Sequence, residues 1–179
     1  MEIRALGEDD DRSQFQSGDP DLDRFLHRFA GQNQFRHYVG VTYVVAEDRR
    51  ILGFATVAPG HVEVDGLPAT ARKKLPRYPL PVLRLARLAV DRSARGQGLG
   101  AQLLRFVCQL ALRMAKDYGC VGVVVDAKPD AVGFYAKYGF IPLDAVEGQS
   151  DARPQASVMF LATRLIERAL GARRRVNRP

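Results

Sequence analysis

The stretch LRLARLAVDRSARGQGLGAQLL, residues 83–104, decides the fold of this chain. It predicts a strand over 83–90, a polar turn, and then a helix. Three glycines lie on alternate positions where the strand hands over to the helix: Gly96, Gly98 and Gly100. Glycines there let backbone N–H groups approach a ligand closely, and a helix N-terminus adds partial positive charge. The unit therefore predicts an anion site, and phosphate is the anion that suits it.

Two common phosphate loops fit this unit poorly. A Walker loop is excluded because it requires Gly, four further residues, and then Gly-Lys followed by Ser or Thr. A dinucleotide fingerprint is formally met by Gly96, Gly98 and Ala101, but a polar turn separates Val90 from Gly96. The fingerprint normally follows its strand directly, and past mid-chain it leaves little room for a doubly wound sheet. A flexible turn would account for one or two of the glycines, but it explains three less well.

Length and composition are those of one globular domain or of a compact pair of domains. Of 179 residues, 46% are hydrophobic and 26% are charged, which excludes disordered, collagen-like and coiled-coil proteins. No stretch approaches the roughly 20 apolar residues of a membrane span, and the acidic start lacks the regions of a signal peptide, so we expect a cytoplasmic protein. Cys108 and Cys120 lack the spacing of a zinc site. We expect both to be reduced core thiols, and no metal site is predicted.

Hydrophobic periodicity predicts strands and helices in alternation, which is typical of the α/β or α+β class. The expected strands are 2–6, 42–46, 51–58, 83–90, 121–125, 140–143 and 156–161. The expected helices are one that opens at Asp19-Pro20, a short one at 67–75, a long amphipathic one that ends near Tyr118, one at 130–138 and one at 163–170. We interpret residues 1–170 as a single domain and 171–179 as a basic, disordered tail.

Positive charge is concentrated in two places. The net charge of the chain is +7, but residues 1–70 carry −5, residues 71–105 carry +8 and residues 164–179 carry +5. The central cluster comprises Arg72, Lys73, Lys74, Arg77, Arg84, Arg87, Arg92 and Arg95. Such clustering suits a polyanionic partner, because each cation placed near a phosphate releases counterions. For the arginines of the tail, a solvated basic segment is an equally good interpretation.

Two ordered motifs resemble one enzyme family. The segment 95–100, RGQGLG, resembles the Arg/Gln-x-x-Gly-x-Gly/Ala signature of the GCN5-related N-acetyltransferases (GNAT), and the second signature follows as VGVVVDA at 121–127 and FYAKYGF at 134–140. The resemblance implies the GNAT fold, a mixed, mostly antiparallel, splayed sheet flanked by helices, with acetyl-CoA as cofactor. The cofactor-binding residues that it implies are Leu88, Ala89 and Val90 along the pantetheine arm, Arg95, Gly96, Gln97, Gly98, Leu99, Gly100 and Ala101 at the pyrophosphate, and Phe134 and Lys137.

Three further segments are similar to a subgroup of this family. They are GDPDLDRFLHRFAGQNQ at 18–34, LPRYPLPV at 75–82 and RLAVDRSARGQGLG at 87–100. They resemble the acetyltransferase toxins of bacterial toxin–antitoxin modules, and the resemblance covers most of residues 17–162. It implies an enzyme that acetylates the α-amine of aminoacyl-tRNA and so blocks translation. It also implies a homodimer and an antitoxin of the ribbon-helix-helix type.

The resemblance assigns one catalytic residue, Tyr135, which stands where the family has a tyrosine that protonates the departing thiolate. Of the neighbouring rings, we expect Phe134 to face the core. A general base is not obvious, because His27, His37 and His61 are scattered, and Glu63 is a candidate only through a water molecule. An α-amine, with a pKa of about 7.7 to 8.0, has a useful neutral fraction at pH 7 without a base.

The acceptor side is expected to be basic. The residues predicted to hold tRNA are Arg72, Lys73, Lys74, Arg77, Arg84 and Arg87. Tyr78 has two interpretations, a ring that stacks on a terminal base and a hydrophobic anchor for the proline turn. Recognition would be by phosphate and shape. Two other functions stay open: a GNAT enzyme that acetylates a protein or small-molecule amine, and a nucleic-acid-binding module without enzymatic activity, in which Tyr135 would be dispensable.

Overall fold

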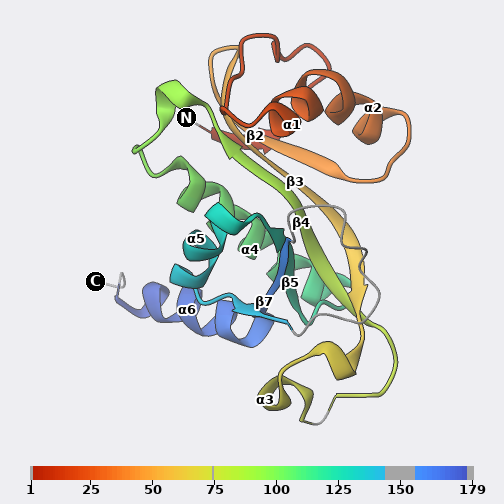
Figure 1. Ribbon diagram of the computed structural model, residues 1–179. Helices are drawn as coiled ribbons and strands as arrows, with labels where there is room; N and C mark the ends of the chain where they lie inside the picture. The colour runs from red at the N-terminus through yellow and green to blue at the C-terminus, as the bar shows by residue number, and fades with distance from the viewer. Residues whose placement is uncertain (1, 74, 144–155, 177–179) are drawn as a thin grey trace. The chain divides into compact units, whose positions relative to one another are not determined.

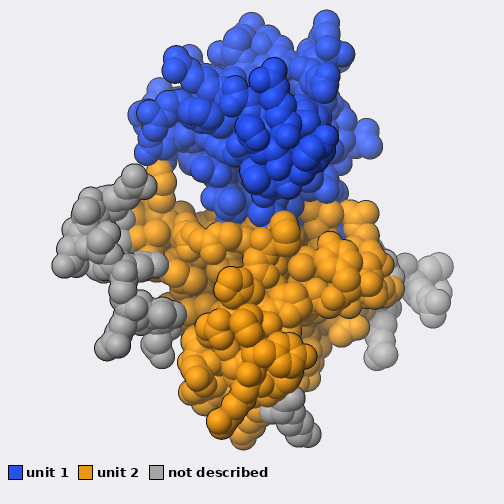
Figure 2. Space-filling view, turned by 90° about the vertical axis from the view of Figure 1, so that its right-hand side faces the viewer, with its two compact units in different colours: residues 1–58, 85–109 blue, residues 59–84, 110–179 orange. Residues whose placement is uncertain are grey.

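The computed structural model describes residues 2–73, 75–143 and 156–176, with side chains as far as Gly171. The chain divides into two compact units (Figure 2). Unit 1 comprises residues 1–58 and 85–109, and unit 2 comprises residues 59–84 and 110–179.

Seven strands form one sheet in the order β1-β2-β3-β4-β5-β7-β6 (Figure 1). The strands are β1 (Glu2–Ala5), β2 (Val41–Glu47), β3 (Arg50–Val62), β4 (Leu80–Val90), β5 (Gly122–Ala127), β6 (Ile141–Pro142) and β7 (Ser157–Ala162). The pairs β1/β2, β2/β3, β5/β7 and β6/β7 are antiparallel. The fold class expected from the sequence, a mixed and mostly antiparallel sheet with flanking helices, is therefore confirmed.

The helices are short, with two exceptions. The α-helices are α1 (Pro20–Arg24), α2 (Ala30–Phe35), α3 (Ala69–Arg72), α4 (Leu99–Asp117), α5 (Val132–Lys137) and α6 (Thr163–Val176). A π-helical turn, η1 (Phe25–Phe29), joins α1 to α2, and the 3-10 turns are η2 (Val64–Gly66), η3 (Arg92–Ala94) and η4 (Pro129–Ala131). None of the helices in the described ranges is long and apolar enough to cross a membrane.

The core of unit 1 lies between its strands and the N-terminal helices. Asp19 caps α1 by accepting hydrogen bonds from the N–H groups of Asp21 and Leu22, the arrangement that Asp-Pro predicts at a helix start. The chain then buries Phe25, Leu26 and Ala30, which share one core cluster with Phe15, Phe54 and Ala89. The N-terminal helices are thereby packed against the strand that leads into the glycine-rich loop.

The core of unit 2 is built on β5 and β7. The two strands pair in register from Gly122 opposite Ala162 to Ala127 opposite Ser157, and residues 122–125 are buried, as the continuous apolar run predicts. A Cβ at Gly122 would lie 2.2 Å from the Phe160 ring, so only glycine fits there.

Several boundaries differ from those expected. The helix predicted over 67–75 is reduced to α3, and the strand predicted over 51–58 continues as β3 to Val62. Because β2 begins at Val41, opposite Val57, Pro59 lies beyond the β2–β3 ladder, and its missing N–H removes no bond from that ladder. Helix α6 runs to Val176, so part of the segment that we expected to be a disordered tail is helical.

Candidate active site

The glycine-rich loop of unit 1 has the geometry of a phosphate site. Gly96 and Gly98 have φ angles of +78° and +76°, in the left-handed region that glycine adopts without strain. A Cβ at either position would meet nothing within 4 Å, so conformation rather than packing requires glycine. Gln102 donates to the Gly98 carbonyl at 3.1 Å to begin the ladder of α4. The amides of the first turn consequently have no acceptor within the helix and suit an anion.

Asp91 fixes the start of this loop. Its side chain is buried, and its two oxygens accept hydrogen bonds from the N–H of Gln16 at 2.9 Å and from the N–H and hydroxyl of Ser93 at 2.9 and 2.6 Å. Burial alone would raise the pKa of Asp91, but these hydrogen bonds and the Arg50 guanidinium at 3.6 Å outweigh it, so the pKa is lowered. The ionised carboxylate thus ties the N-terminal segment to the loop.

Two arginines also connect the glycine-rich loop to the N-terminal segment. The N–H of Arg92 donates to the Gln16 carbonyl at 2.9 Å, and the Arg95 guanidinium donates to the Ser17 carbonyl. Arg95, predicted to bind the cofactor pyrophosphate, is therefore at least partly engaged in holding the loop. Sequence reasoning missed the role of Asp91, although an aspartate at the first position of a strand-to-helix turn is a recognisable cap.

We expect Asp91→Asn to loosen the loop. Whichever way the new amide turns, its NH2 group faces the N–H of Gln16 or of Ser93, and one partly buried donor loses its acceptor. An unsatisfied buried donor costs about 1–3 kcal/mol, and for a chain of this length the upper bound on the loss of Tm is about 12 °C. Thermal unfolding and titration with acetyl-CoA should show a lower Tm and weaker binding. Asp65→Asn, at an exposed aspartate of η2, is the control, and an unchanged Asp91 variant would contradict this role.

The end of β4 carries the predicted pantetheine strand. Ala89 is buried in the core of unit 1, whereas Leu88 and Val90 are half-buried. Arg87, on the same strand, does not lie free on the surface as expected: its Cζ lies 3.7 Å from the centroid of the Phe25 ring. Burial lowers the pKa of Arg87.

Tyr135 lies in unit 2, on α5. The expectation that Phe134 faces the core was wrong: Tyr135 is 5% exposed, and Phe134 is only half-buried. The Tyr135 ring packs against those of Phe134 and Phe140, with centroids 5.1 and 5.4 Å away. Burial raises the pKa of Tyr135 to about 12, so the phenol keeps its proton at neutral pH.

The Tyr135 hydroxyl is the reactive end of this side chain. It makes no hydrogen bond among the described residues, and none of their fully buried polar side-chain atoms lacks a partner. Its oxygen is therefore not fully buried but retains some exposure, while the ring is packed. Lys137, predicted to contact the cofactor, is exposed at the end of the same helix, with its Nζ 5.9 Å from the centroid of the Tyr138 ring.

The basic segment of unit 2 is only partly as predicted. Arg72, Lys73 and Arg77 are exposed, and none of them has an ion pair within the described part of the chain; Tyr78 is 60% exposed beside them. Arg84, in contrast, is paired with Asp126 of β5, and Lys74 lies outside the described residues. Of the six residues predicted to hold tRNA, Arg72, Lys73 and Arg77 are therefore the ones that the described structure leaves exposed and without an ion pair.

No strong general base emerges from the described ranges. His27 is bonded to the Phe15 carbonyl at 2.9 Å, and His37, His61 and Glu63 are exposed. No group of acidic, histidine or cysteine side chains among these residues is placed to hold a metal. Cys108 and Cys120 are free and buried, as expected, and burial raises the pKa of Cys108 to about 11, which keeps its thiol protonated.

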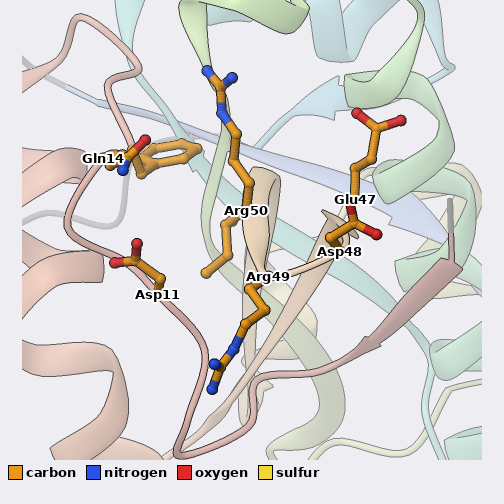
Figure 3. Close-up of a pocket in the computed structure, with 8 residues that line it drawn as sticks. Asp11, Gln14, Glu47, Asp48, Arg49 and Arg50 are labelled. Atoms are coloured by element: carbon orange, nitrogen blue, oxygen red, sulfur yellow. The ribbon is translucent and has the colours of Figure 1, made fainter.

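A pocket of about 320 Å³ lies elsewhere in unit 1. It is lined by Asp11, Gln14, Phe15, Ile51 and the β2–β3 turn, residues 47–50, and by none of the residues predicted to bind a cofactor or an acceptor. Figure 3 shows Asp11 and Gln14 on one side of the pocket and Glu47 and Asp48 on the other, with Arg49 and Arg50 between them. Arg50 reaches Ser93 at 2.9 Å, so its guanidinium supports the glycine-rich loop.

Comparisons with known proteins agree with this geometry. The model of the acetyltransferase (GNAT) domain matches residues 39–142. A tRNA-acetylating toxin of Mycobacterium tuberculosis is 36% identical over 140 residues, which are 76% of this chain and 82% of that toxin.

Two solved structures cover nearly the whole chain. AtaT complexed with acetyl-methionyl-tRNAfMet is 29% identical, with a TM-score of 0.83, and the match covers 94% of this chain and 98% of AtaT. A Tyr→Phe mutant of AtaT, bound to acetyl-CoA and to the C-terminus of the antitoxin AtaR, is 26% identical with a TM-score of 0.77 and covers 95% and 97% of the two chains.

Proposed function

This chain belongs to the GNAT family of acetyltransferases, and we propose that it transfers acetyl from acetyl-CoA to the α-amine of aminoacyl-tRNA. The observation that best supports acetyl-CoA as the cofactor is the pair of glycines with positive φ, Gly96 and Gly98, just before α4. The acceptor is supported by the relatives, because the similar toxin is named for acetylating tRNA and AtaT is complexed with an acetylated aminoacyl-tRNA.

The loop residues fit the cofactor by their chemistry. The backbone N–H groups from Gly96 to Ala101 would bind the pyrophosphate, since the first amides of a helix offer unpaired donors and a positive dipole end. The edge of β4 at Leu88, Ala89 and Val90 would pair with the pantetheine arm, and an N–H there would polarise the acetyl carbonyl. Phe134 and Lys137 would contribute further contacts. Acetyl-CoA supplies the acetyl group as an activated thioester.

Tyr135 is proposed as the proton donor. A thiol has an ordinary pKa near 8.5, and a phenol whose pKa is raised to about 12 stays protonated over the pH range in which the amine reacts. The Tyr135 hydroxyl would hold its proton at Oη until the departing sulfur accepts it. The α-amine needs no strong base, because its own pKa of about 7.7 to 8.0 provides a neutral fraction.

The exposed cations Arg72, Lys73 and Arg77, together with Lys74, are proposed to hold the tRNA backbone, with Tyr78 as a stacking ring. Arg84 is assigned a smaller share, because Asp126 neutralises it. Acetylation would stop translation, so the protein would act as a cytoplasmic toxin. A homodimer and an antitoxin of the ribbon-helix-helix type complete the proposal, and AtaT is bound to the antitoxin AtaR.

The direct test is the release of free CoA thiol. Wild-type protein with acetyl-CoA should release thiol when charged tRNA is added and should release none with the same tRNA stripped of its amino acid. Thiol release that needs a protein or polyamine acceptor instead would keep the cofactor and reject tRNA. Thiol release in neither case, with normal acetyl-CoA binding, would also reject the acceptor.

Charge reversal at Lys73 and Arg77 should separate acceptor from cofactor binding. Each cation lost from a phosphate contact weakens binding, so Lys73→Glu with Arg77→Glu should raise the KM for charged tRNA about tenfold or more and spare the KM for acetyl-CoA. The matched control is Arg113→Glu with Lys116→Glu, which changes the same charge at two exposed residues of α4. Equal damage to both KM values would contradict this division.

A further inference from the structure

Arg87 lies over a group of packed, buried aromatic side chains in unit 1. Its guanidinium carbon lies 3.7 Å from the centroid of the Phe25 ring. Phe25 is in turn stacked on Phe54, at 6.2 Å and an interplanar angle of 26°, and Phe15 meets Phe54 edge-on at 5.4 Å. The three rings are almost fully buried, so the position of the guanidinium is set by the core.

Arg87 differs from three other arginines, which form ion pairs. Arg4, Arg50 and Arg84 each have a carboxylate partner, namely Asp10, Asp91 and Asp126. Arg87 is half-buried, and within the described residues it has no ion pair and no hydrogen bond from its side chain. A partly desolvated charge without an anion is costly, and one cation–π contact offsets only part of that cost.

The geometry leaves the donors of Arg87 available. The guanidinium carbon lies over the Phe25 ring, and this contact uses none of the five N–H donors, which form the fork that matches a phosphate. None of the fully buried polar side-chain atoms described lacks a partner, so the unbonded nitrogens of Arg87 reach solvent. The core of unit 1 therefore does not enclose these donors.

The place of Arg87 in the chain is the second observation. It directly precedes Leu88, the first residue of the β4 edge proposed to pair with the pantetheine arm, and β4 leads into the glycine-rich loop. Its ring partner Phe25 opens the π-helical turn η1, where the N–H of Ala30 bonds to the Phe25 carbonyl. Single π-turns inside helices occur frequently at functional sites.

We propose that Arg87, stacked on Phe25, is a phosphate-binding residue of the active site. The proposal rests on the function proposed above and adds a preorganised cation on β4, the strand proposed to pair with the pantetheine arm of acetyl-CoA. Two substrates bring phosphate to such a site: the 3′ end of charged tRNA and CoA. The chemistry of recognition is the same for both, so the test has one arm for each.

The experiment uses the full-length protein and three variants. Arg87→Gln removes the charge and the fork, Arg87→Lys keeps the charge without the planar fork, and Arg105→Gln removes the charge of an exposed arginine of α4 as the control. For each protein, Tm, the two KM values, and the equilibrium affinities for CoA and for uncharged tRNA are measured. The affinities do not depend on turnover.

We expect Arg87→Gln to weaken the binding of one substrate about tenfold or more and to leave Tm within a few degrees of wild type. Arg87→Lys should have an intermediate affinity, and Arg105→Gln should bind both substrates as wild type does. A higher KM for charged tRNA and a lower affinity for uncharged tRNA, with normal affinity for CoA, would show that Arg87 binds a phosphate of the RNA. A lower affinity for CoA, with normal values for tRNA, would show that it binds a phosphate of CoA. If neither affinity changes in Arg87→Gln, or only Tm falls, the residue is a packing element and the proposal is overturned.

Failure of the proposed function has a different signature. Wild-type protein would then acetylate no charged tRNA at all. The affinity for CoA alone would then decide whether Arg87 binds phosphate: a tenfold loss in Arg87→Gln would support the proposal, and an unchanged affinity would overturn it.

Discussion

Tyr135→Phe is expected to lower kcat by about 10²–10⁴-fold, the range for loss of a positioned general acid. The ring remains, so its packing against Phe134 and Phe140 is kept. The hydroxyl makes no hydrogen bond among the described residues, so its removal leaves no buried group without a partner, and Tm and the KM for acetyl-CoA should change little. Steady-state kinetics with thermal unfolding measure all three.

The control for this variant is Tyr138→Phe, one helical turn further on, where the side chain is 39% exposed. It should keep wild-type kcat. A Tyr135 variant with wild-type kcat would show that the sulfur leaves without this proton. An equal loss of kcat in both variants would indicate a packing effect on α5.

The pH dependence of wild-type kcat/KM gives a second reading of Tyr135. The rate should rise as the α-amine loses its proton near pH 7.7 to 8.0. Because burial raises the pKa of Tyr135 to about 12, the acid stays protonated, and no descending limb should appear up to about pH 10. A rate that falls between pH 8 and 9 would contradict the assignment of this phenol as the acid.

Gly98→Val should have the second-largest effect, on the cofactor. Gly98 has a φ of +76°, which costs an L-residue about 1–2 kcal/mol and a β-branched one more. A Cβ there would meet nothing within 4 Å, so the chain would fold but the loop would relax toward negative φ. The amides that face the phosphate would move, and we expect the Kd for acetyl-CoA to rise roughly 10²-fold.

Gly66→Val is the matched control, because Gly66 has no positive φ and a Cβ there also meets nothing within 4 Å. It should bind acetyl-CoA as wild type does. Titration calorimetry of the two variants checks the difference. Wild-type affinity in Gly98→Val would mean that the loop is not the pyrophosphate site.

Local patterns were predictable from the sequence, and contacts between distant residues were not. The strand, the glycine loop and α4 follow from neighbouring residues, so they were expected in the right place. Which ring of Phe134 and Tyr135 faces inward depends on how α5 packs against Phe140, and the order of residues does not reveal this. The wrong expectation there does not alter the candidate role of Tyr135.

The charged residues illustrate the same limit. Arg84 and Arg87 were both predicted to hold tRNA, but Asp126 pairs with the first and Phe25 lies under the second. Each partner is at least forty residues away in the chain, so no local pattern points to it. Arg72, Lys73 and Arg77 lie in a short exposed segment and stay exposed, as a local reading predicts.

The measurement that tests the account most directly is transfer of radiolabelled acetyl from acetyl-CoA to a pool of charged tRNA. It is run beside the same pool stripped of its amino acids and beside the Tyr135→Phe variant. We expect label on charged tRNA only, released with the amino acid when the ester is hydrolysed, and almost none with the variant. Absence of label from charged tRNA, in protein that still binds acetyl-CoA, would contradict the tRNA acceptor and direct the search to other amines.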